Sequence, residues 1–249
     1  GFFGAAASPL VEGNRVLLNV GGKNAGIAAF DAATGKTLWT STTDEASYAS
    51  PAAHTIAGAR HALFFTRAGL VSLDPVTGRE RFRWPWRARM NASVNASTPI
   101  VAGNFVFISA SYGTGAAVLE IGPGGPKKVW SSDDALSNHY ATSVHHDGFL
   151  YGYHGRQEEG PSLRSVELAA GKVRWSVDRF RAGTILLAGS TLLIQREDGE
   201  LVLAPASPAA FRPLARAQVV GGTVRAYPAL AGGLWFVRNE KTLVAVGLR

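Results

Sequence analysis

Glycine residues recur along this 249-residue chain with a period close to 45 residues, and this period constrains the fold more than any other feature. Each glycine lies in a short turn between two apolar runs: Gly13, Gly58, Gly103, Gly148, Gly189 and Gly232. The repeats contain short β-prone runs such as 63–65 and 105–107, and no long helical pattern. This spacing is typical of a four-stranded propeller blade, so the sequence predicts an all-β fold, a β-propeller of four-stranded antiparallel blades.

The repeats predict about six blades in a single propeller domain over residues 1–249. The sixth repeat has sequence for three strands, and the chain begins with Gly1 and not with Met. We therefore expect the six blades to be an arc of a ring of seven or eight blades. The expected blade boundaries are approximately 1–41, 42–86, 87–132, 133–177, 178–219 and an incomplete 220–249.

One repeat carries a motif that two others share in part. Residues 29–39 read Ala-Phe-Asp-Ala-Ala-Thr-Gly-Lys-Thr-Leu-Trp, and the partial copies lie at 72–82 and 165–175. This pattern resembles the tryptophan-docking motif (Ala-x-Asp-x-x-Thr-Gly-x-x-x-Trp) of the pyrroloquinoline-quinone-like, or quinoprotein-like, propeller repeat family. The motif residues are Asp31, Thr34, Gly35 and Trp39 in the full copy, and Asp74, Gly78, Gly171 and Trp175 in the partial copies.

The motif also has a physical interpretation of its own. An Asp before Thr-Gly makes a tight turn, because its side chain accepts local backbone N–H groups and the Gly supplies a positive φ. The Trp four residues later then lies on the outer strand, where its ring can cover the neighbouring blade. We therefore predict structural roles between blades for Trp39, Trp84, Trp130 and Trp175.

Composition narrows the class of protein. Hydrophobic residues make up 46% of the chain, yet no continuous apolar run is long enough for a membrane helix, so we expect no membrane-spanning segment. Cysteine is absent, which excludes disulfides and thiolate metal sites. The net charge of +7 falls mainly on predicted turns and outer strands, so we expect a solvated rim and no nucleic-acid partner.

Polar and aromatic residues are predicted to ring the mouth of the propeller channel. They precede the inner strands of several blades or lie in loops beside them: Tyr48, Asn95, His139, Arg225, Arg67 and Tyr112. Such a mouth suits a small polar or anionic ligand, or a peptide. The alternative is that these groups cap strand ends and hold channel water. In either case we predict an exposed rim, where substitutions barely change stability.

A metal site is the obvious alternative at His145-His146-Asp147, because imidazole and carboxylate groups bind zinc. The register places His146 at the end of an inner strand, beside the turn of Asp147 and Gly148. Adjacent strand residues point to opposite sides of a sheet, so these imidazoles cannot easily share one ion. We predict no metal here.

Three functional classes remain open. The first is a non-catalytic scaffold that binds a protein or peptide partner or a small polar ligand, as resemblance to the outer-membrane assembly lipoproteins and other quinoprotein-like bacterial proteins implies. The second is a quinone-dependent dehydrogenase oxidising an alcohol or sugar, which needs pyrroloquinoline quinone, calcium and a carboxylate base. The third is a hydrolase or lyase using His139. We favour the scaffold, with no catalytic residue and no cofactor, and the resemblance implies a periplasmic or other extracytoplasmic location.

Overall fold

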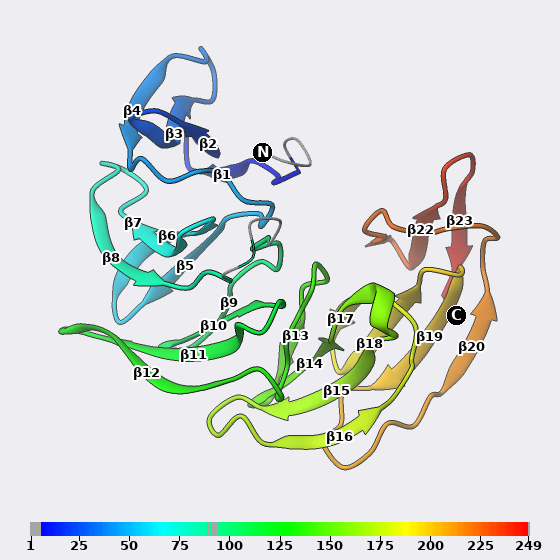
Figure 1. Cartoon of the computed structure of the whole chain (residues 1–249). Helices are drawn as coiled ribbons and strands as arrows, with labels where there is room; N and C mark the ends of the chain where they lie inside the picture. The colour runs from blue at the N-terminus through cyan, green and yellow to red at the C-terminus, as the bar shows by residue number, and fades with distance from the viewer. Residues whose placement is uncertain (1–5, 89, 91–93, 249) are drawn as a thin grey trace. The chain divides into compact units, whose positions relative to one another are not determined.

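The computed structural model describes residues 6–88, 90 and 94–248, and these residues form antiparallel strands almost throughout. Within them the strands make six sheets, each a meander in which consecutive strands pair side by side (Figure 1). Five sheets have four strands, and the last has three. The predicted fold class, an all-β propeller with six blades, is confirmed.

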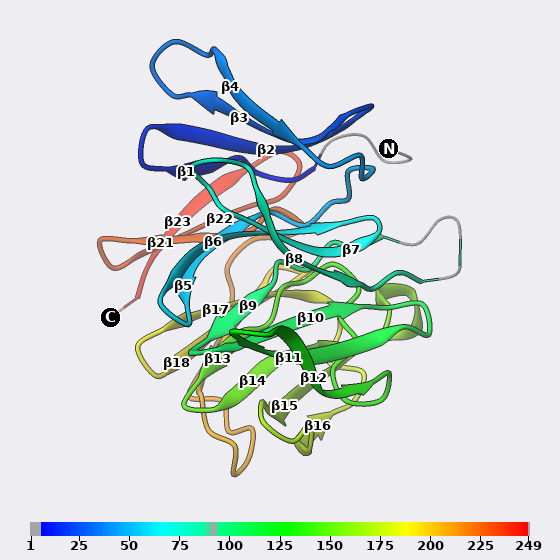
Figure 2. The same ribbon diagram turned by 90° about the vertical axis from the view of Figure 1, so that its left-hand side faces the viewer.

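The chain divides into two compact units, residues 1–140 with 168–171 and residues 141–167 with 172–249. The first unit contains the first three sheets, and Figure 2 shows β1 to β4 following one another in order. Its strands are β1 (Leu10–Glu12), β2 (Arg15–Gly22), β3 (Ala25–Asp31), β4 (Thr37–Ser41), β5 (Ala52–Ile56), β6 (Ala59–Thr66), β7 (Gly69–Leu73), β8 (Glu80–Pro85), β9 (Ile100–Ala102), β10 (Phe105–Ala110), β11 (Gly115–Gly122) and β12 (Gly125–Ser132).

The second unit contains two four-stranded sheets, the three-stranded sheet and one short 3₁₀ turn, η1 (Gln157–Glu159). Its strands are β13 (Val144–His146), β14 (Phe149–His154), β15 (Ser162–Glu167), β16 (Val173–Val177), β17 (Gly183–Ala188), β18 (Thr191–Arg196), β19 (Glu200–Pro205), β20 (Ala215–Gln218), β21 (Ala229–Ala231), β22 (Leu234–Arg238) and β23 (Leu243–Gly247).

The periodic glycines close the hairpins between the first and second strands of the blades. At Ala57-Gly58 and Asp147-Gly148 both residues have positive φ, between 46° and 82°. Two consecutive residues in this region match the right-handed twist of the paired strands, and glycine adopts the conformation without steric cost. The glycine period in the sequence is therefore a period of two-residue hairpin turns.

The apolar core lies between neighbouring sheets. Leu17, Ile27 and Ala29 of the first blade pack against Phe64 and Val71 of the second. The opposite face of the second blade packs on the third in the same way, in a cluster that includes Leu63, Phe65, Val106 and Leu119. Second and third strands are therefore buried on both faces, which explains why they read as continuous apolar runs.

The Asp-x-x-Thr-Gly segment folds into a tight turn. The Asp31 Oδ1 atom accepts hydrogen bonds from the backbone N–H of Thr34 at 2.8 Å and from its hydroxyl at 2.7 Å. Gly35 follows with φ +70°. Asp74 and Gly78 build the same turn in the second blade, where the Asp74 carboxylate accepts the N–H of Val76 and also binds Arg81.

Tryptophan rings lie against these turns. A Cβ atom added to Gly78 would come within 2.6 Å of the Trp39 ring, so the indole of β4 lies directly on the turn of the next blade. In the same way a Cβ at Gly171 would come within 2.8 Å of the Trp130 ring, whose N–H donates to the Leu168 carbonyl. Glycine at these two turns thus leaves the space that the ring occupies.

In the second unit Trp175 closes the corresponding junction with a different contact. Its indole N–H donates to the Ser207 carbonyl at 2.8 Å, and its ring lies 5.5 Å from the Phe211 ring. The fifth blade has an irregular segment here in place of an Asp-x-x-Thr-Gly turn.

Candidate functional site

Two of the residues predicted at the channel mouth form one cluster. Tyr112 lies in the loop between β10 and β11, and His139 lies after β12. The Tyr112 hydroxyl is 2.9 Å from His139 Nε2, and the two rings meet edge to face with centroids 5.5 Å apart. The Tyr140 ring also lies close to His139, with centroids 5.3 Å apart. All three residues are half-buried.

Buried polar groups hold the His139 segment in place. The Ser109 hydroxyl donates to the Leu136 carbonyl and accepts the backbone N–H of Asn138 at 2.7 Å. Asn138 is fully buried, and its side-chain oxygen accepts a hydrogen bond from Ser97. Because a buried hydrogen-bond network fixes one geometry, His139 projects from a rigid base.

Tyr112 has an uncommon backbone conformation. Its φ is +67°, in the left-handed region that residues other than glycine rarely adopt. Such a conformation costs on the order of 1 kcal/mol, and surrounding contacts must hold it. The hydrogen bond to His139 is one such contact. The strained backbone of Tyr112 therefore lies within the aromatic cluster of the first unit.

Asn95 is a correction to the predicted exposed rim, because it is 4% exposed. Its side-chain amide donates to the Thr66 carbonyl at 2.8 Å and to the Trp86 carbonyl at 3.0 Å. Its backbone carbonyl accepts the N–H of Tyr48 and the Ser47 hydroxyl. The expectation that the Asn95 side chain is exposed is wrong, since its amide is buried and donates to backbone carbonyls of the second blade.

The other predicted rim residues, Tyr48, Arg67 and Arg225, contact residues outside the Tyr112–His139 cluster. Tyr48 is half-buried and joins Asn95 through its backbone. Arg67 pairs with Glu45 at 3.1 Å. Arg225 belongs to the second unit, is exposed, and has its nearest carboxylate oxygen at 3.8 Å, on Glu197.

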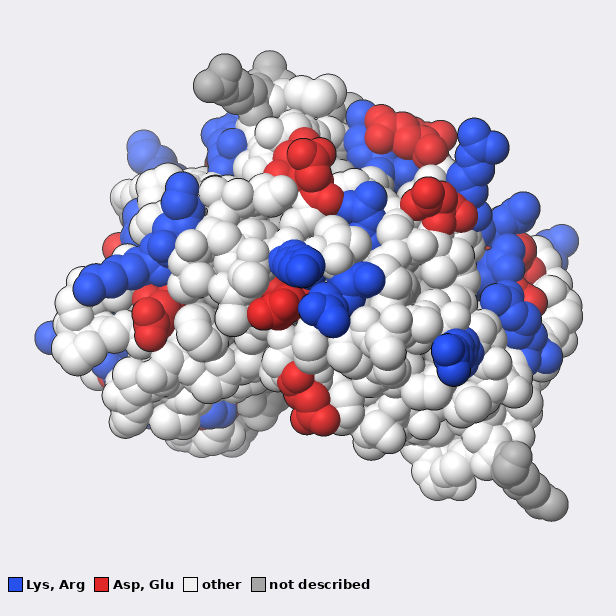
Figure 3. All heavy atoms as spheres, turned by 90° about the horizontal axis from the view of Figure 1, so that it is seen from below, with Lys and Arg blue, Asp and Glu red and all other residues white. Residues whose placement is uncertain are grey.

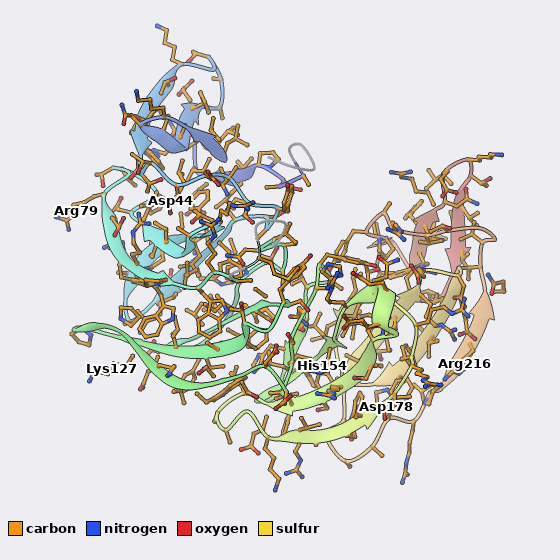
Figure 4. All side chains as sticks on the ribbon, viewed as in Figure 1. Asp44, Arg79, Lys127, His154, Asp178 and Arg216 are labelled. Carbon is orange, nitrogen blue, oxygen red and sulfur yellow. The ribbon has the colours of Figure 1, made fainter. Side chains whose placement is uncertain are left out.

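Charged side chains of the second blade pair with one another. The Asp44 carboxylate, labelled in Figure 4, accepts two hydrogen bonds from Arg83 at 2.8 Å and one from the Thr66 hydroxyl. Arg83 also binds Glu80, and both carboxylates raise the pKa of the guanidinium. On the face in Figure 3, basic and acidic side chains are interspersed.

The His145-His146-Asp147 segment is a strand end and a hairpin turn. His145 Nε2 accepts the backbone N–H of Gly148 at 3.2 Å, and burial together with the neighbouring His146 lowers the pKa of His145. His146 lies 3.4 Å from the Asp147 carboxylate. In the part of the chain that the structure describes, no three His, Cys, Asp or Glu side chains converge as metal ligands.

That result also bears on the quinone alternative. Calcium beside pyrroloquinoline quinone needs several carboxylate or amide oxygens directed at one point. The described residues do not form such an acidic group. The described side chains therefore supply no cluster of carboxylates for such a calcium ion.

The second unit has a small polar cleft that the sequence did not predict. It has a volume of about 230 Å³ and is lined by His154, Arg156, Glu159, Asp178 and Arg179. Figure 4 labels His154 and Asp178 at this place. Arg156 pairs with Glu158 and Glu159 of η1, so charges of both signs line the cleft. The cleft becomes visible only in the structure, because it forms where η1 lies close to residues 178–179.

The sequence also missed the residues that support the Tyr112–His139 cluster, Ser109 and Asn138. For Asn138 the sequence offered a weak signal, because Ser or Asn precedes the inner strand in several blades. Polar residues there are more simply expected in solvent, so burial could not be assigned without the backbone path.

The repeated four-stranded meanders and the rings lying on glycine turns define a β-propeller of the quinoprotein-like class. A family model described as outer membrane protein assembly factor BamB matches residues 2–176, and the chain belongs to this family. No curated protein matches the chain in sequence.

Solved structures share the fold at low sequence identity. BamB from Moraxella catarrhalis superimposes with a TM-score of 0.74 at 15% identity, over 97% of this chain and 71% of that one. The computationally designed protein Ika8 gives a TM-score of 0.66 at 13% identity, over 93% and 67%. Quinohemoprotein alcohol dehydrogenase from Comamonas testosteroni gives 0.58 at 14% identity, over 87% and 43%. No helix in the described residues is long and apolar enough to span a membrane.

Proposed function

We propose that this chain is a non-catalytic propeller scaffold that binds a peptide segment of a protein partner through Tyr112, His139 and Tyr140. The family supports a scaffold role, since its model is described as an outer membrane assembly factor. The same description supports a periplasmic location at the outer membrane.

The half-buried aromatic cluster on a rigid base is the observation that carries this proposal. Its three rings offer flat apolar faces, and the Tyr112–His139 pair offers a donor and an acceptor that can exchange roles with the tautomer. Tyr and His rings lose little conformational freedom on binding, which is why aromatic residues dominate protein recognition sites. The buried Ser109 and Asn138 hold the surface in advance of binding.

The test selects peptides from a displayed random library on the wild-type protein and measures their affinity for three variants. Tyr112→Phe removes only the hydroxyl, and His139→Ala removes the centre of the cluster. Lys127→Ala is the matched control, because Lys127 is an exposed residue of β12 in the same unit. We expect His139→Ala to weaken binding at least about tenfold, or 1.4 kcal/mol, Tyr112→Phe to weaken it less, and Lys127→Ala to leave it unchanged.

Circular dichroism melting of each variant separates binding from folding. Equal affinity for the wild type, His139→Ala and Lys127→Ala would show that the peptides use another surface. Failure to select any peptide would also count against the proposal.

A further inference from the structure

The polar cleft of the second unit is formed by two segments of the fourth blade. One is the β14–β15 loop, which contains η1, and the other is residues 178–179, directly after β16. Four charged side chains line the cleft: Arg156 and Glu159 from the loop, and Asp178 and Arg179 after β16. Because two of them are basic and two are acidic, their charges cancel.

The two sides of the cleft differ in how their charges are paired. On the loop side, Arg156 binds Glu158 and lies 3.8 Å from a Glu159 oxygen. On the other side, the Asp178 carboxylate accepts one hydrogen bond from the Ser176 hydroxyl at 2.9 Å. In the described part of the chain neither Asp178 nor Arg179 forms an ion pair, although the two are sequence neighbours. The cleft therefore offers one carboxylate and one guanidinium to a ligand.

The backbone around Arg179 has an uncommon conformation. Its φ is +51°, and that of Arg181 is +71°, both in the left-handed region that residues other than glycine rarely adopt. Phe180 between them is buried, and its N–H donates to the Pro161 carbonyl at 3.0 Å. A Cβ atom added to Gly160 would lie 3.9 Å from Arg179 Cγ, so the arginine stem lies near the end of η1. Strained backbone of this kind is common at ligand clamps, where surrounding contacts hold it.

The volume and the charges of the cleft limit its ligand. A volume of about 230 Å³ equals roughly eight water molecules at about 30 Å³ each, which is less than a drug-sized ligand needs. A simple anion would be repelled by Asp178, and a simple cation by Arg179, because like charges placed together are costly. A small molecule that carries one charge of each sign avoids both costs.

We propose that this cleft binds a small zwitterion, a free amino acid or a dipeptide, with its carboxylate on Arg179 and its ammonium group on Asp178. A guanidinium matches a carboxylate through two parallel N–H donors, and a carboxylate accepts the N–H groups of an ammonium ion. His154, labelled with Asp178 in Figure 4, also lines the cleft. The site is separate from the Tyr112–His139 cluster, which belongs to the first unit.

The test compares three dipeptide probes by nuclear magnetic resonance titration of the whole chain. Glycylglycine carries both charges, N-acetylglycylglycine lacks the ammonium group, and glycylglycinamide lacks the carboxylate. Glycylglycine should shift the amide signals of residues 155–160 and 178–180. It should bind at least about tenfold more tightly than either blocked probe.

Two variants assign the two charges of the probe. Arg179→Gln should weaken glycylglycine binding at least about tenfold and leave the affinity for glycylglycinamide unchanged. Asp178→Asn should weaken glycylglycine binding to a similar extent and leave the affinity for N-acetylglycylglycine unchanged. The matched control is Lys172→Gln, because Lys172 is exposed and directly precedes β16, at the other end of the strand from Asp178. It should leave the affinity for all three probes unchanged.

Other ligand classes give different results. Equal binding of N-acetylglycylglycine and glycylglycine would identify an anion site, and equal binding of glycylglycinamide and glycylglycine a cation site; either result overturns the proposal. It is also overturned if glycylglycine shifts no signals, or shifts only signals outside the cleft. Should a variant not fold, as judged from its spectrum, the comparison of the three probes on the wild type still decides.

Discussion

The junction between the first and second blades and the junction between the fifth and sixth blades solve the same packing problem differently. In the first, the Trp39 ring lies on Gly78, and a glycine is needed because a Cβ would clash with the ring. In the second, the equivalent outer-strand position is Ala215, and a cavity of about 460 Å³ lies beside it, Val246 and Leu248. The difference teaches that apolar side chains of the inner strands pack at both junctions, while the outer-strand residue of the row changes from an indole to a methyl group. We call the first junction closed and the second open.

Removing the indole from the closed junction should have the largest effect. Trp39→Ala is expected to lower the free energy of unfolding by about 3 kcal/mol, since it deletes a ring that packs on the cluster of Leu17 and Val71. Ala215→Ser at the equivalent position is the control and should change it by less than about 0.5 kcal/mol. Chemical denaturation of both variants measures the contrast, and equal losses would remove the distinction between closed and open junctions.

The next largest loss of stability is expected from removing the Asn95 side chain, which links the second and third blades through hydrogen bonds. Asn95→Ala should cost about 2 kcal/mol, because the carbonyls of Thr66 and Trp86 lose their donor in a buried place. Asn104→Ala, which removes an exposed hydrogen bond to the Ala57 N–H, is the control and should cost less. Urea unfolding followed by fluorescence gives both values. A cost near zero for Asn95→Ala would mean that water replaces the amide.

The glycine under the ring offers a sharper test of the closed junction. Gly78→Ala should cost about 2 kcal/mol, because φ is +72° and the new Cβ would meet the Trp39 ring. Gly35→Ala has nearly the same φ, +70°, and nothing within 4 Å of the added Cβ, so it should cost only about 1 kcal/mol. Thermal melting of the pair isolates the ring contact. If both variants lost the same stability, the cost of Gly78→Ala would come from the backbone conformation alone and not from contact with the Trp39 ring.

The smallest expected effect concerns a junction of intermediate kind, where Phe82 takes the tryptophan position and packs on buried His61. Burial, assisted by Arg81, lowers the pKa of His61. The unfolded chain binds a proton near pH 6.5 while the folded chain does not, so this stability is present above that pH and is lost as the pH falls through the folded pKa.

The His61→Gln variant should therefore show a shallower loss of stability between about pH 7 and 5 than the wild type. His54 and His145 also have lowered pKa values and keep their own contributions. Denaturation midpoints across this pH range provide the measurement. An unchanged slope in His61→Gln would assign the pH dependence to the other two histidines.

The repeats in the sequence predicted the blades and the positions of their strands, because hairpin glycines and β-branched runs act locally. The sequence could not predict Ala215 as the tryptophan equivalent, since the fifth repeat has no Asp-x-x-Thr-Gly marker and only the strand register reveals the match. For Asn95, its register before an inner strand predicted exposure, while the fold surrounds its amide with backbone carbonyls. Tyr112 and His139 were both predicted at the mouth, and their direct contact depends on a positive φ that no local pattern shows.

Each sheet is a meander of consecutive strands, so its hydrogen-bonded neighbours are also its neighbours in the sequence. In repeat architectures, stability is close to a sum over repeats and their adjacent interfaces. A substitution then affects mainly its own blade and the two adjacent interfaces, so one blade can lose the Asp-x-x-Thr-Gly-x-x-x-Trp motif while the others keep it. The complete motif at residues 29–39, the partial copies at 72–82 and 165–175 and the absence of the motif from the fifth blade fit such independent change in each blade. The most diverged junction is the one with most freedom to acquire a role of its own.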